Sequence, residues 1–173
     1  MLGRPDRVEP KLLGQLGRAA DSGRVRIPPV VRQDHAEVHD PRLTSARVAR
    51  LATTDPDGRP HLVPIVFAID GDTVYSAVDR KPKRSRTLQR IENARARPDV
   101  TILVDHYDDD WSRLWWIRVR GLARVLDDGD ERKRALELLT RKYAQYEHEP
   151  PDGPVLAVDV YETRAWSASA SRR

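Results

Sequence analysis

The chain has 173 residues, 39% of them hydrophobic and 34% charged, which suits one globular domain with a buried core and leaves no apolar run able to span a membrane. It contains no cysteine, which excludes disulfides, thiolate metal sites and a cysteine nucleophile, and favours the reducing cytoplasm. Its net charge of +4 at pH 7 favours an anionic partner, such as nucleic acid, an acidic membrane or a phosphorylated small molecule.

Residues 1–40 differ in pattern from the rest of the chain. Gly14 and Gly17 weaken the one helical pattern there, and the pair Pro28-Pro29 excludes regular structure after it. No continuous apolar stretch resembles a secretory signal. We therefore expect residues 1–40 to be an N-terminal extension and residues 41–170 to form the folded domain.

Short elements separated by clear turns follow residue 40. A short helix and then a strand are expected first. The sequence DPDG, Asp55 to Gly58, predicts a hairpin turn because apolar runs flank it. The returning strand, Leu62 to Ile69, is apolar at nearly every position, so we expect it to be buried on both faces. A second turn at residues 70–72 leads into a strand at residues 73–78.

Pro64 interrupts this apolar strand and removes one backbone donor from it. One interpretation is a β-bulge that helps to close a barrel. The other is a backbone ladder left open, so that a flat ligand can approach the strand between Val63 and Ile65. The two interpretations are compatible.

A cluster of cations precedes the next predicted helix. Residues 80–91 carry six basic side chains and no acid, although a helix is expected to begin near Arg84 because Leu88, Ile91 and Ala94 recur at core spacing. Cations destabilise a helix N-terminus, so this cluster needs either screening by water or a bound anion. A phosphate site made of helix N–H groups with Lys and Arg is favoured over a solvated charge run. Nucleic-acid binding is a third interpretation, for which the sequence carries no recognised fingerprint.

The second half of the chain is rich in strands. Strands are predicted at residues 100–107, at Trp115–Leu126, where small and apolar residues alternate with Trp116 and arginines, and at residues 154–166. A helix is predicted over residues 130–143, behind acids that suit a helix start. Since no βαβ alternation and no internal repeat occurs, the order of elements favours an antiparallel barrel with peripheral helices.

Motifs that carry chemistry by themselves are missing. The sequence has no GxxxxGK[ST], GxGxxG, HExxH or GxSxG pattern, and its histidines show no metal-ligand spacing. His106 lies among Asp105 and Asp108–Asp110 in a grouping that resembles a site for a hard metal, but a polar loop between strands is the favoured interpretation, and no metal is expected. A phosphate site without a strong acid–base set suggests that a cofactor carries the chemistry.

The order of three segments resembles the pyridoxamine 5′-phosphate oxidase-like split-barrel superfamily. The segments are VARLATTDPDGRPHLVPIVFAIDGDTVYSAVDRKPKR, VTILVDHYDDDWSRLWWIRVRGLARVL and AVDVYETRAWSAS. The resemblance covers about Pro41 to Ala168, and KPKR with DHYDDDWSRLWW is most similar to the actinobacterial branch of coenzyme F420-dependent oxidoreductases. It implies a mainly β fold, an antiparallel split β-barrel of the FMN-binding type with peripheral α-helices.

The resemblance also implies a homodimer with two cofactor sites at the subunit interface. The cofactor phosphate would bind the cations between the third strand and the following helix, here Lys81, Lys83 and Arg84, with Ser76 on the strand before them. The ring would lie along the second strand, here His61, Val63, Pro64 and Ile65. Trp111, after the acidic loop, would approach the ring from the partner subunit.

These observations lead to three hypotheses about function. The first is an enzyme that transfers hydride between coenzyme F420 and an unsaturated or quinone-like small molecule. The second is an FMN-binding oxidoreductase on the same fold. The third is a non-enzymatic cofactor carrier or a basic nucleic-acid-binding module, although nucleic acid and membrane are not the expected partners. The arginine and histidine set with which pyridoxamine phosphate oxidase binds its substrate phosphate is not visible near the C-terminus, which argues against that reaction, and no catalytic acid is assigned.

Overall fold

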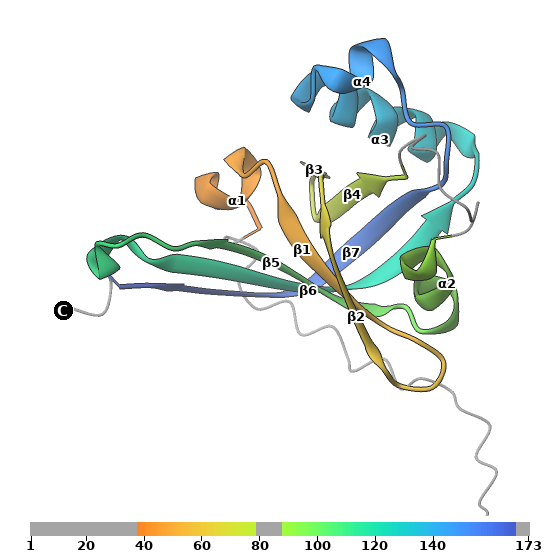
Figure 1. Ribbon diagram of the computed structural model, residues 1–173. Coiled ribbons are helices and arrows are strands. Elements are labelled where there is room, and N and C mark those ends of the chain that lie inside the picture. The colour runs from red at the N-terminus through yellow and green to blue at the C-terminus, as the bar shows by residue number, and fades with distance from the viewer. Residues whose placement is uncertain (1–37, 79–87, 169–173) are drawn as a thin grey trace, which may run out of the picture.

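The structure, a computed structural model, describes residues 38–78 and 88–168, which form one curled antiparallel sheet with helices around it (Figure 1). The strands are β1 Ala49–Thr54, β2 Pro60–Ile65, β3 Ala68–Asp70, β4 Thr73–Ala77, β5 Asp99–His106, β6 Trp115–Leu126 and β7 Val155–Ser167. The helices are α1 Pro41–Ser45, α2 Gln89–Ala96, the 3₁₀ helix η2 Trp111–Arg113, α3 Gly129–Lys142 and α4 Gln145–His148. The predicted mainly β class with peripheral helices is confirmed. Within the described ranges, every helix is too short or too polar to cross a membrane.

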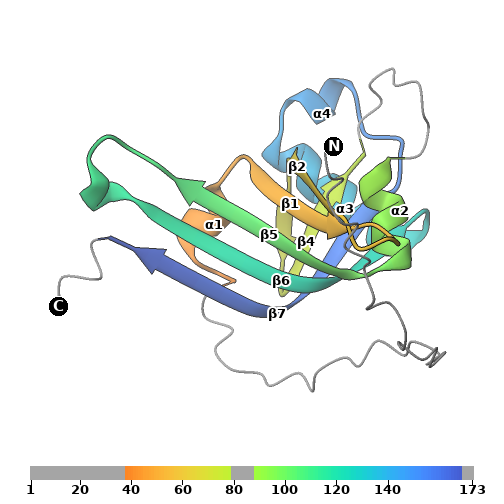
Figure 2. The same ribbon diagram turned by 60° about the horizontal axis from the view of Figure 1, so that its bottom comes forward.

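The two ends of the sheet are joined by only two residues. The strands lie in the order β2-β1-β5-β6-β7-β4-β3, so β2 and β3 are at opposite ends of the sheet. Along the chain, however, β2 ends at Ile65 and β3 begins at Ala68. A linker formed by Val66 and Phe67 can connect these ends only if the sheet curls until they meet, as Figures 1 and 2 show. This curling is what makes the sheet a barrel.

Tyr143 fixes the point of closure from the end of α3. The Phe67 amide donates to the Tyr143 hydroxyl at 3.1 Å, and that hydroxyl lies 2.8 Å from the Phe67 carbonyl oxygen and 2.9 Å from that of Arg47. The hydroxyl can donate to one of the two carbonyls at a time. Phe67 is fully buried, so its backbone groups need partners that water cannot supply there. Burial raises the pKa of Tyr143 and keeps the hydroxyl protonated as a donor.

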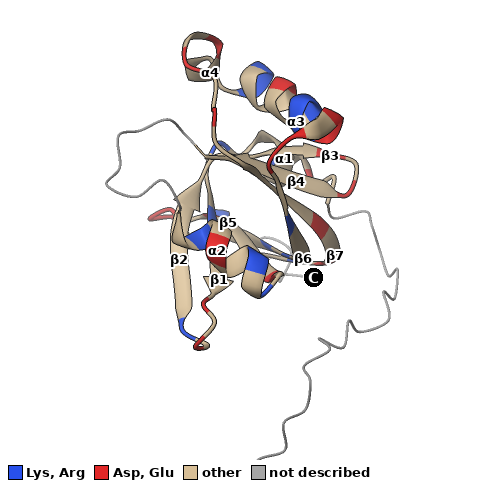
Figure 3. Cartoon of the chain, turned by 90° about the vertical axis from the view of Figure 1, so that its right-hand side faces the viewer, with Lys and Arg blue, Asp and Glu red and all other residues tan. Residues whose placement is uncertain are grey.

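The core has two parts, one on each side of the curled sheet. The barrel interior is filled by side chains such as Leu51, Ile102 and Ile117. A second cluster packs between the sheet and α3, where Leu139 is fully buried and Tyr75 nearly so. α3 carries acids in its first turn and bases in its last, the distribution that a helix dipole favours (Figure 3).

Arg124 on β6 joins α3 to the sheet. It donates to both carboxylate oxygens of Asp159 on β7, at 2.6 and 2.9 Å, and to both of Glu131 in the first turn of α3, at 2.8 and 2.9 Å. The Tyr75 hydroxyl on β4 adds a bond to Glu131 at 3.1 Å. Arg124 holds the pKa of both carboxyl groups below their usual values, which shows that each is stabilised as an anion.

The alternation predicted for β6 is confirmed, but its partner β7 contains a bulge that the sequence did not reveal. Arg120 pairs with Glu162 while Gly121 pairs with Val160, so Tyr161 is an extra residue in β7. A Cβ on Gly121 would lie 2.5 Å from Val158 Cγ1 and 2.6 Å from the Asp159 carbonyl oxygen. Only glycine allows β7 to approach so closely at the bulge.

The strand predicted over Leu62–Ile69 is the main error of the sequence interpretation. The hairpin turn before it is confirmed, with Gly58 at φ 88°. The apolar run itself divides into β2 and β3, however, and β2 is an edge strand on which Leu62 is 65% exposed. Burial on both faces was therefore wrong. The apolar residues are spread over the edge strand β2, the corner at Val66 and Phe67, and the second edge strand β3. Hydrophobic periodicity in the sequence does not distinguish these three environments.

α2 confirms the core face predicted for the second helix. Ile91 and Ala94 are buried and Leu88 packs against the barrel core. The described helix begins at Gln89; residues 79–87, which include the predicted start near Arg84, lie outside the described residues. The sequence interpretation missed Asn93, which is fully buried and donates to the hydroxyl of Thr53 on β1 at 2.9 Å.

Lys142 generates a prediction about pH. Its Nζ donates to the Thr44 carbonyl at 3.0 Å and lies 4.2 Å from the centre of the Phe67 ring. Burial, together with the nearby charge of Arg47, lowers the pKa of Lys142 to about 8, whereas the pKa of an unfolded lysine is about 10.4. Between these values the unfolded chain binds more protons than the folded one, so stability rises with pH in this window.

We expect the unfolding free energy of the wild type, relative to a Lys142→Met variant, to increase as pH rises from about 8 towards about 10. Denaturant unfolding at a series of pH values measures this difference. Lys133→Met is the matched control, because Lys133 is an exposed α3 lysine paired with Asp130. A wild-type-minus-variant difference that stays flat for Lys142 would contradict the prediction.

Candidate functional site

The outer edge of β2 is unpaired within the part of the chain that the structure describes. β2 pairs there with β1 alone, in a register without a shift. The Asp55 amide donates to the Arg59 carbonyl at 3.0 Å, so these two residues form a hydrogen-bonded pair. Because such pairs recur at every second residue, the odd-numbered residues of β1 and β2 are those whose backbone groups bond to each other. The backbone groups of Leu62 and Pro64 therefore point away from β1, along the open edge.

Pro64 fits this edge position because it has no N–H to leave unpaired. The β1–β2 ladder has no bulge at Pro64, which lies opposite Arg50. The bulge interpretation is therefore wrong for this strand, and Pro64 sits on an open edge. The open groups are nevertheless not those between Val63 and Ile65, whose N–H and C=O face β1. They are the amide and carbonyl of Leu62 and the carbonyl of Pro64.

The residues predicted to contact a ring are divided between the two faces of β2. Ile65 is 5% exposed and belongs to the barrel core, and Val63 packs against that core. His61 lies on the same face and is half-buried. The side chain of Pro64 is exposed on the opposite face, beside Leu62. A planar ligand at this edge would thus contact backbone along its rim and the Leu62 and Pro64 side chains on one face.

The predicted phosphate residues lie beyond β4. Ser76 is on β4, opposite Leu156 of β7, and is 5% exposed. Lys81, Lys83 and Arg84 lie outside the described residues, which stop at residue 78 and resume at residue 88. The structure confirms the strand before this segment and the helix after it, and the phosphate site stays a prediction.

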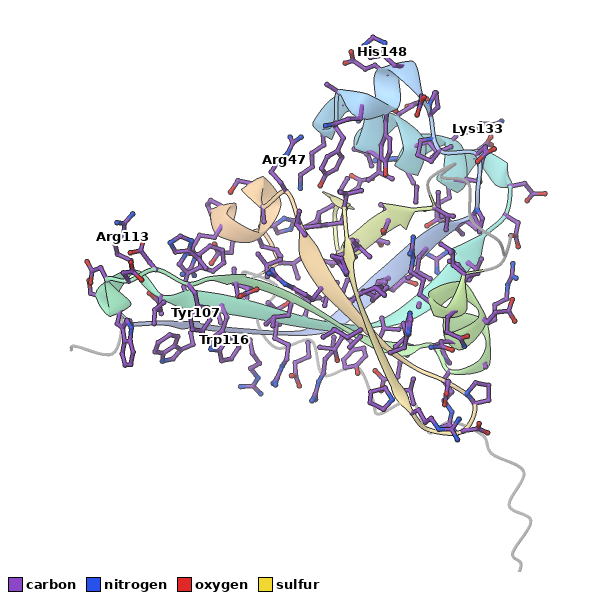
Figure 4. All side chains as sticks on the ribbon, viewed as in Figure 1. Arg47, Tyr107, Arg113, Trp116, Lys133 and His148 are labelled. Atoms are coloured by element: carbon purple, nitrogen blue, oxygen red, sulfur yellow. The ribbon has the colours of Figure 1, made fainter. Side chains whose placement is uncertain are left out.

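Trp111 lies at the tip of a long arm, which we define as residues 104–116 with the paired end of β7, residues 164–168. It is the first residue of η2 and is 78% exposed. Figure 1 shows this tip far from β2, and Arg113 of the same 3₁₀ helix marks it in Figure 4. The chain therefore does not bring its own Trp111 to its own β2 edge. An approach from a partner subunit stays a prediction.

The base of the arm packs against α1. The Trp115 ring stacks with the ring of His106, with centroids 6.1 Å apart, and the guanidinium of Arg42 lies 5.3 Å from its centre. Arg42 is in turn held by Asp40. His106 thus has a packing role, and its Nε2 lies 3.6 Å from Asp108. No group of side chains within residues 38–78 and 88–168 is arranged to hold a metal ion.

The face of the sheet opposite the barrel interior, here called the outer face, is rich in arginine. Cross-strand partners place two rows of side chains there: Leu62, Ala52, Thr101, Arg120 and Glu162 in one, and Pro64, Arg50, Leu103, Arg118 and Arg164 in the other. Arg118, Arg120 and Arg164 share the carboxylate of Glu162 at 3.7, 3.8 and 3.8 Å. One carboxylate for three guanidinium groups leaves this surface positively charged.

A cleft of about 510 Å³ opens on the outer face beside the bulge in β7. Its lining residues are Thr54, Arg97, Pro98, Asp99, Thr101, Arg120 and Tyr161. The Tyr161 hydroxyl donates to Asp99 at 2.8 Å, and burial followed by the Asp99 charge raises the pKa of Tyr161 to about 12. Tyr161 therefore remains a protonated donor at neutral pH.

Sequence reasoning missed this cleft because its residues come from four separate strands and a loop. The one available signal was Gly121, a glycine inside a strongly alternating strand, which is typical of a bulge or a close backbone approach. Gly121 lies on β6, however, whereas the extra residue that it accommodates, Tyr161, is on β7. The polar residues themselves are unremarkable in the sequence.

The sequence over residues 36–167 matches the family described as pyridoxamine 5′-phosphate oxidase. A search of curated proteins found none with a matching sequence. Of the known structures, one of a conserved hypothetical protein from Mycobacterium tuberculosis is similar to this chain with a TM-score of 0.62 and 21% identity, covering 79% of this chain and 86% of that one.

Two further solved structures share the fold. A candidate pyridoxamine 5′-phosphate oxidase from Listeria innocua matches with a TM-score of 0.53 and 24% identity, over 72% of this chain and 91% of that one. An FAD-binding protein from Mesorhizobium loti matches with a TM-score of 0.53 and 24% identity, over 70% and 86%. At these identities the likeness establishes the split-barrel fold and nothing finer.

Proposed function

The chain belongs to the pyridoxamine 5′-phosphate oxidase family, and from this premise we propose that it is an oxidoreductase that uses reduced coenzyme F420 to deliver hydride to an unsaturated or quinone-like small molecule. The family includes FMN-binding oxidoreductases, so a flavin-like cofactor is expected of its fold. The choice of F420 is supported by the stretches KPKR and DHYDDDWSRLWW. The observation that carries the proposal is the unpaired edge of β2.

The β2 edge fits a planar ring that alternates donors and acceptors. The Leu62 amide is a donor, and the Leu62 and Pro64 carbonyls are acceptors, all facing away from β1. Flavins and deazaflavins both carry adjacent carbonyl and N–H groups on one ring, which complement such a row. The absence of an N–H at Pro64 removes a donor that would compete with this arrangement.

In this proposal the protein positions two rings and excludes water. When bound, the reduced cofactor supplies the hydride. The backbone of Leu62 and Pro64 sets the height and tilt of the ring, and the exposed Leu62 side chain packs against one of its faces. Lys81, Lys83 and Arg84 would bind the phosphate and so fix the other end of the cofactor. Orientation of this kind lowers the barrier by pre-paying the entropy of bringing the reactants together.

We also propose that the protein acts as a homodimer. Trp116 and Trp166 lie opposite each other on the outer face of the arm, and Trp166 is 39% exposed. Trp116 and Tyr107 lie along the arm in Figure 4, and Tyr107 is 76% exposed. So many exposed aromatic side chains on one projection are typical of an interface. A second copy would also bring Trp111 towards a β2 edge.

The cofactor is tested by titrating the cofactor-free protein with F420 and FMN in parallel, with calorimetry as the readout. We expect F420 to bind more tightly. Tighter binding of FMN would favour a flavoprotein on the same fold. If neither binds while DNA binds with a steep salt dependence, the oxidoreductase proposal is wrong and nucleic-acid binding takes its place.

We expect Lys83→Ala to weaken cofactor binding by about 10- to 150-fold, because it removes one charge-assisted hydrogen bond to the phosphate. Arg90→Ala, which removes a cation from α2, is the matched control and should change the dissociation constant little. The melting temperature of each cofactor-free variant shows whether folding is intact. Equal losses in both variants would indicate a diffuse basic patch in place of a phosphate site.

Trp116→Ala should weaken the dimer by at least about 10-fold, since buried tryptophans are frequent hot spots of interfaces. Sedimentation velocity over a range of protein concentrations measures this shift. Lys133→Ala, on the exposed face of α3, is the control and should leave the dimer unchanged. A wild-type chain that sediments as a monomer at micromolar concentration would overturn the dimer proposal and the role given to Trp111.

A further inference from the structure

The cleft beside the β7 bulge is separate from the cofactor residues. None of the side chains that line it belongs to the set predicted to bind the ring or the phosphate. It lies on the outer face, where the row containing Thr101 and Arg120 also contains Leu62 at the β2 edge. Its volume of about 510 Å³ is in the range typical of small-molecule sites.

The lining of the cleft has the chemistry of an anion site. Arg97 and Arg120 supply charge, and Thr54 and Thr101 supply hydroxyl groups. The one acid, Asp99, already accepts the Tyr161 hydroxyl at 2.8 Å. Arg97 is held in place by its donation to the Pro56 carbonyl at 2.8 Å, which occupies only one of its five N–H groups.

The charge of Arg120 is incompletely balanced. Its nearest acid within the described residues is Glu162 at 3.8 Å, a distance too long for a direct hydrogen bond. Glu162 is shared with Arg118 and Arg164. The Arg118 Nε is also buried without a hydrogen-bond partner among the described residues. An anion in the cleft would therefore meet a surface with more positive charge than its own acids neutralise.

We propose that this cleft binds an oxyanion, the phosphate or carboxylate group of a small molecule, with Arg97 and Arg120 as its charged contacts. Both anions present oxygen atoms that match the donor fork of a guanidinium group. The adjacent threonine hydroxyls complete the set of donors. The bulge at Tyr161 is the structural reason why a cleft exists at this point of an otherwise continuous sheet.

The test uses the full-length chain without cofactor, titrated with inorganic pyrophosphate and with citrate at constant ionic strength. We expect saturable binding of at least one of them by the wild type, weakened about 10-fold by Arg120→Gln. Arg164→Gln is the matched control, because Arg164 shares the same Glu162 but does not line the cleft. It should change the dissociation constant by less than about 3-fold.

Three results of these titrations would overturn the anion site. Equal weakening in the two variants, or no saturable binding of either probe, overturns the proposal. Arg97→Gln gives a second test on a different element, and retained wild-type affinity in both cleft variants also overturns it. The melting temperature of each variant shows whether it is folded.

The source of the anion follows from a third titration. If Arg120→Gln also weakens F420 or FMN binding, the oxyanion belongs to the cofactor. If it weakens pyrophosphate or citrate binding and leaves cofactor binding unchanged, the oxyanion belongs to another molecule, such as the substrate. Both results uphold the anion site. Since the simple anions are tested without cofactor, a failure of the proposed F420 function leaves this result standing.

Discussion

The hydrogen bonds between Tyr143 and Phe67 are the constraint on which the rest of the structure depends. They hold a two-residue corner at which the chain leaves one end of the sheet and enters the other. Without partners, the buried amide and carbonyl of Phe67 would cost free energy of about 1–3 kcal/mol each. Because the partner comes from the end of α3, that helix is placed by the same contact that closes the barrel. The Arg124 network holds the other end of α3, so the helix is attached to the sheet at both ends.

The closure also leaves open the strand edge at which we propose that a ligand binds. A barrel that closes through a corner between β2 and β3, instead of by pairing, leaves the edge of β2 free within the described residues. α3 covers the outer face of the sheet over β3 and β4, whereas the part of this face formed by β1, β2 and β5 lies away from α3 (Figures 1 and 3). The open edge and the arginine-rich cleft thus lie on one surface. The fold supplies the surface, and the side chains of β5, β6 and β7 give it its charge.

Local patterns predicted local structure well. The alternation in β6, the DPDG turn and the acids in the first turn of α3 each identify an element by interactions within a few residues of one another. The division of Leu62–Ile69 into two strands could not be predicted in this way, because it depends on Tyr143, far away in the chain. The same holds for Asn93 with Thr53 and for the cleft, whose members meet only after β1, β5, β6 and β7 pair. For the candidate site, an open backbone ladder at Pro64 was one of two compatible interpretations of the sequence. The structure shows that the groups facing away from β1 are those of Leu62 and the carbonyl of Pro64, and not those between Val63 and Ile65.

The bulge in β7 has a consequence for how this chain can change during evolution. Before Tyr161, odd-numbered residues of β7 lie opposite even-numbered residues of β6; after it, even-numbered residues do. Beyond it, Glu162, Arg164 and Trp166 lie on the outer face, with Thr163 and Ala165 turned inward. Loss of Tyr161 would remove the bulge and leave Glu162 opposite Arg120, so the residues beyond it would keep their faces, but the wall that Tyr161 gives the cleft would be lost. We therefore expect a related chain without this extra residue to lack the cleft, and to tolerate a larger residue at the position of Gly121.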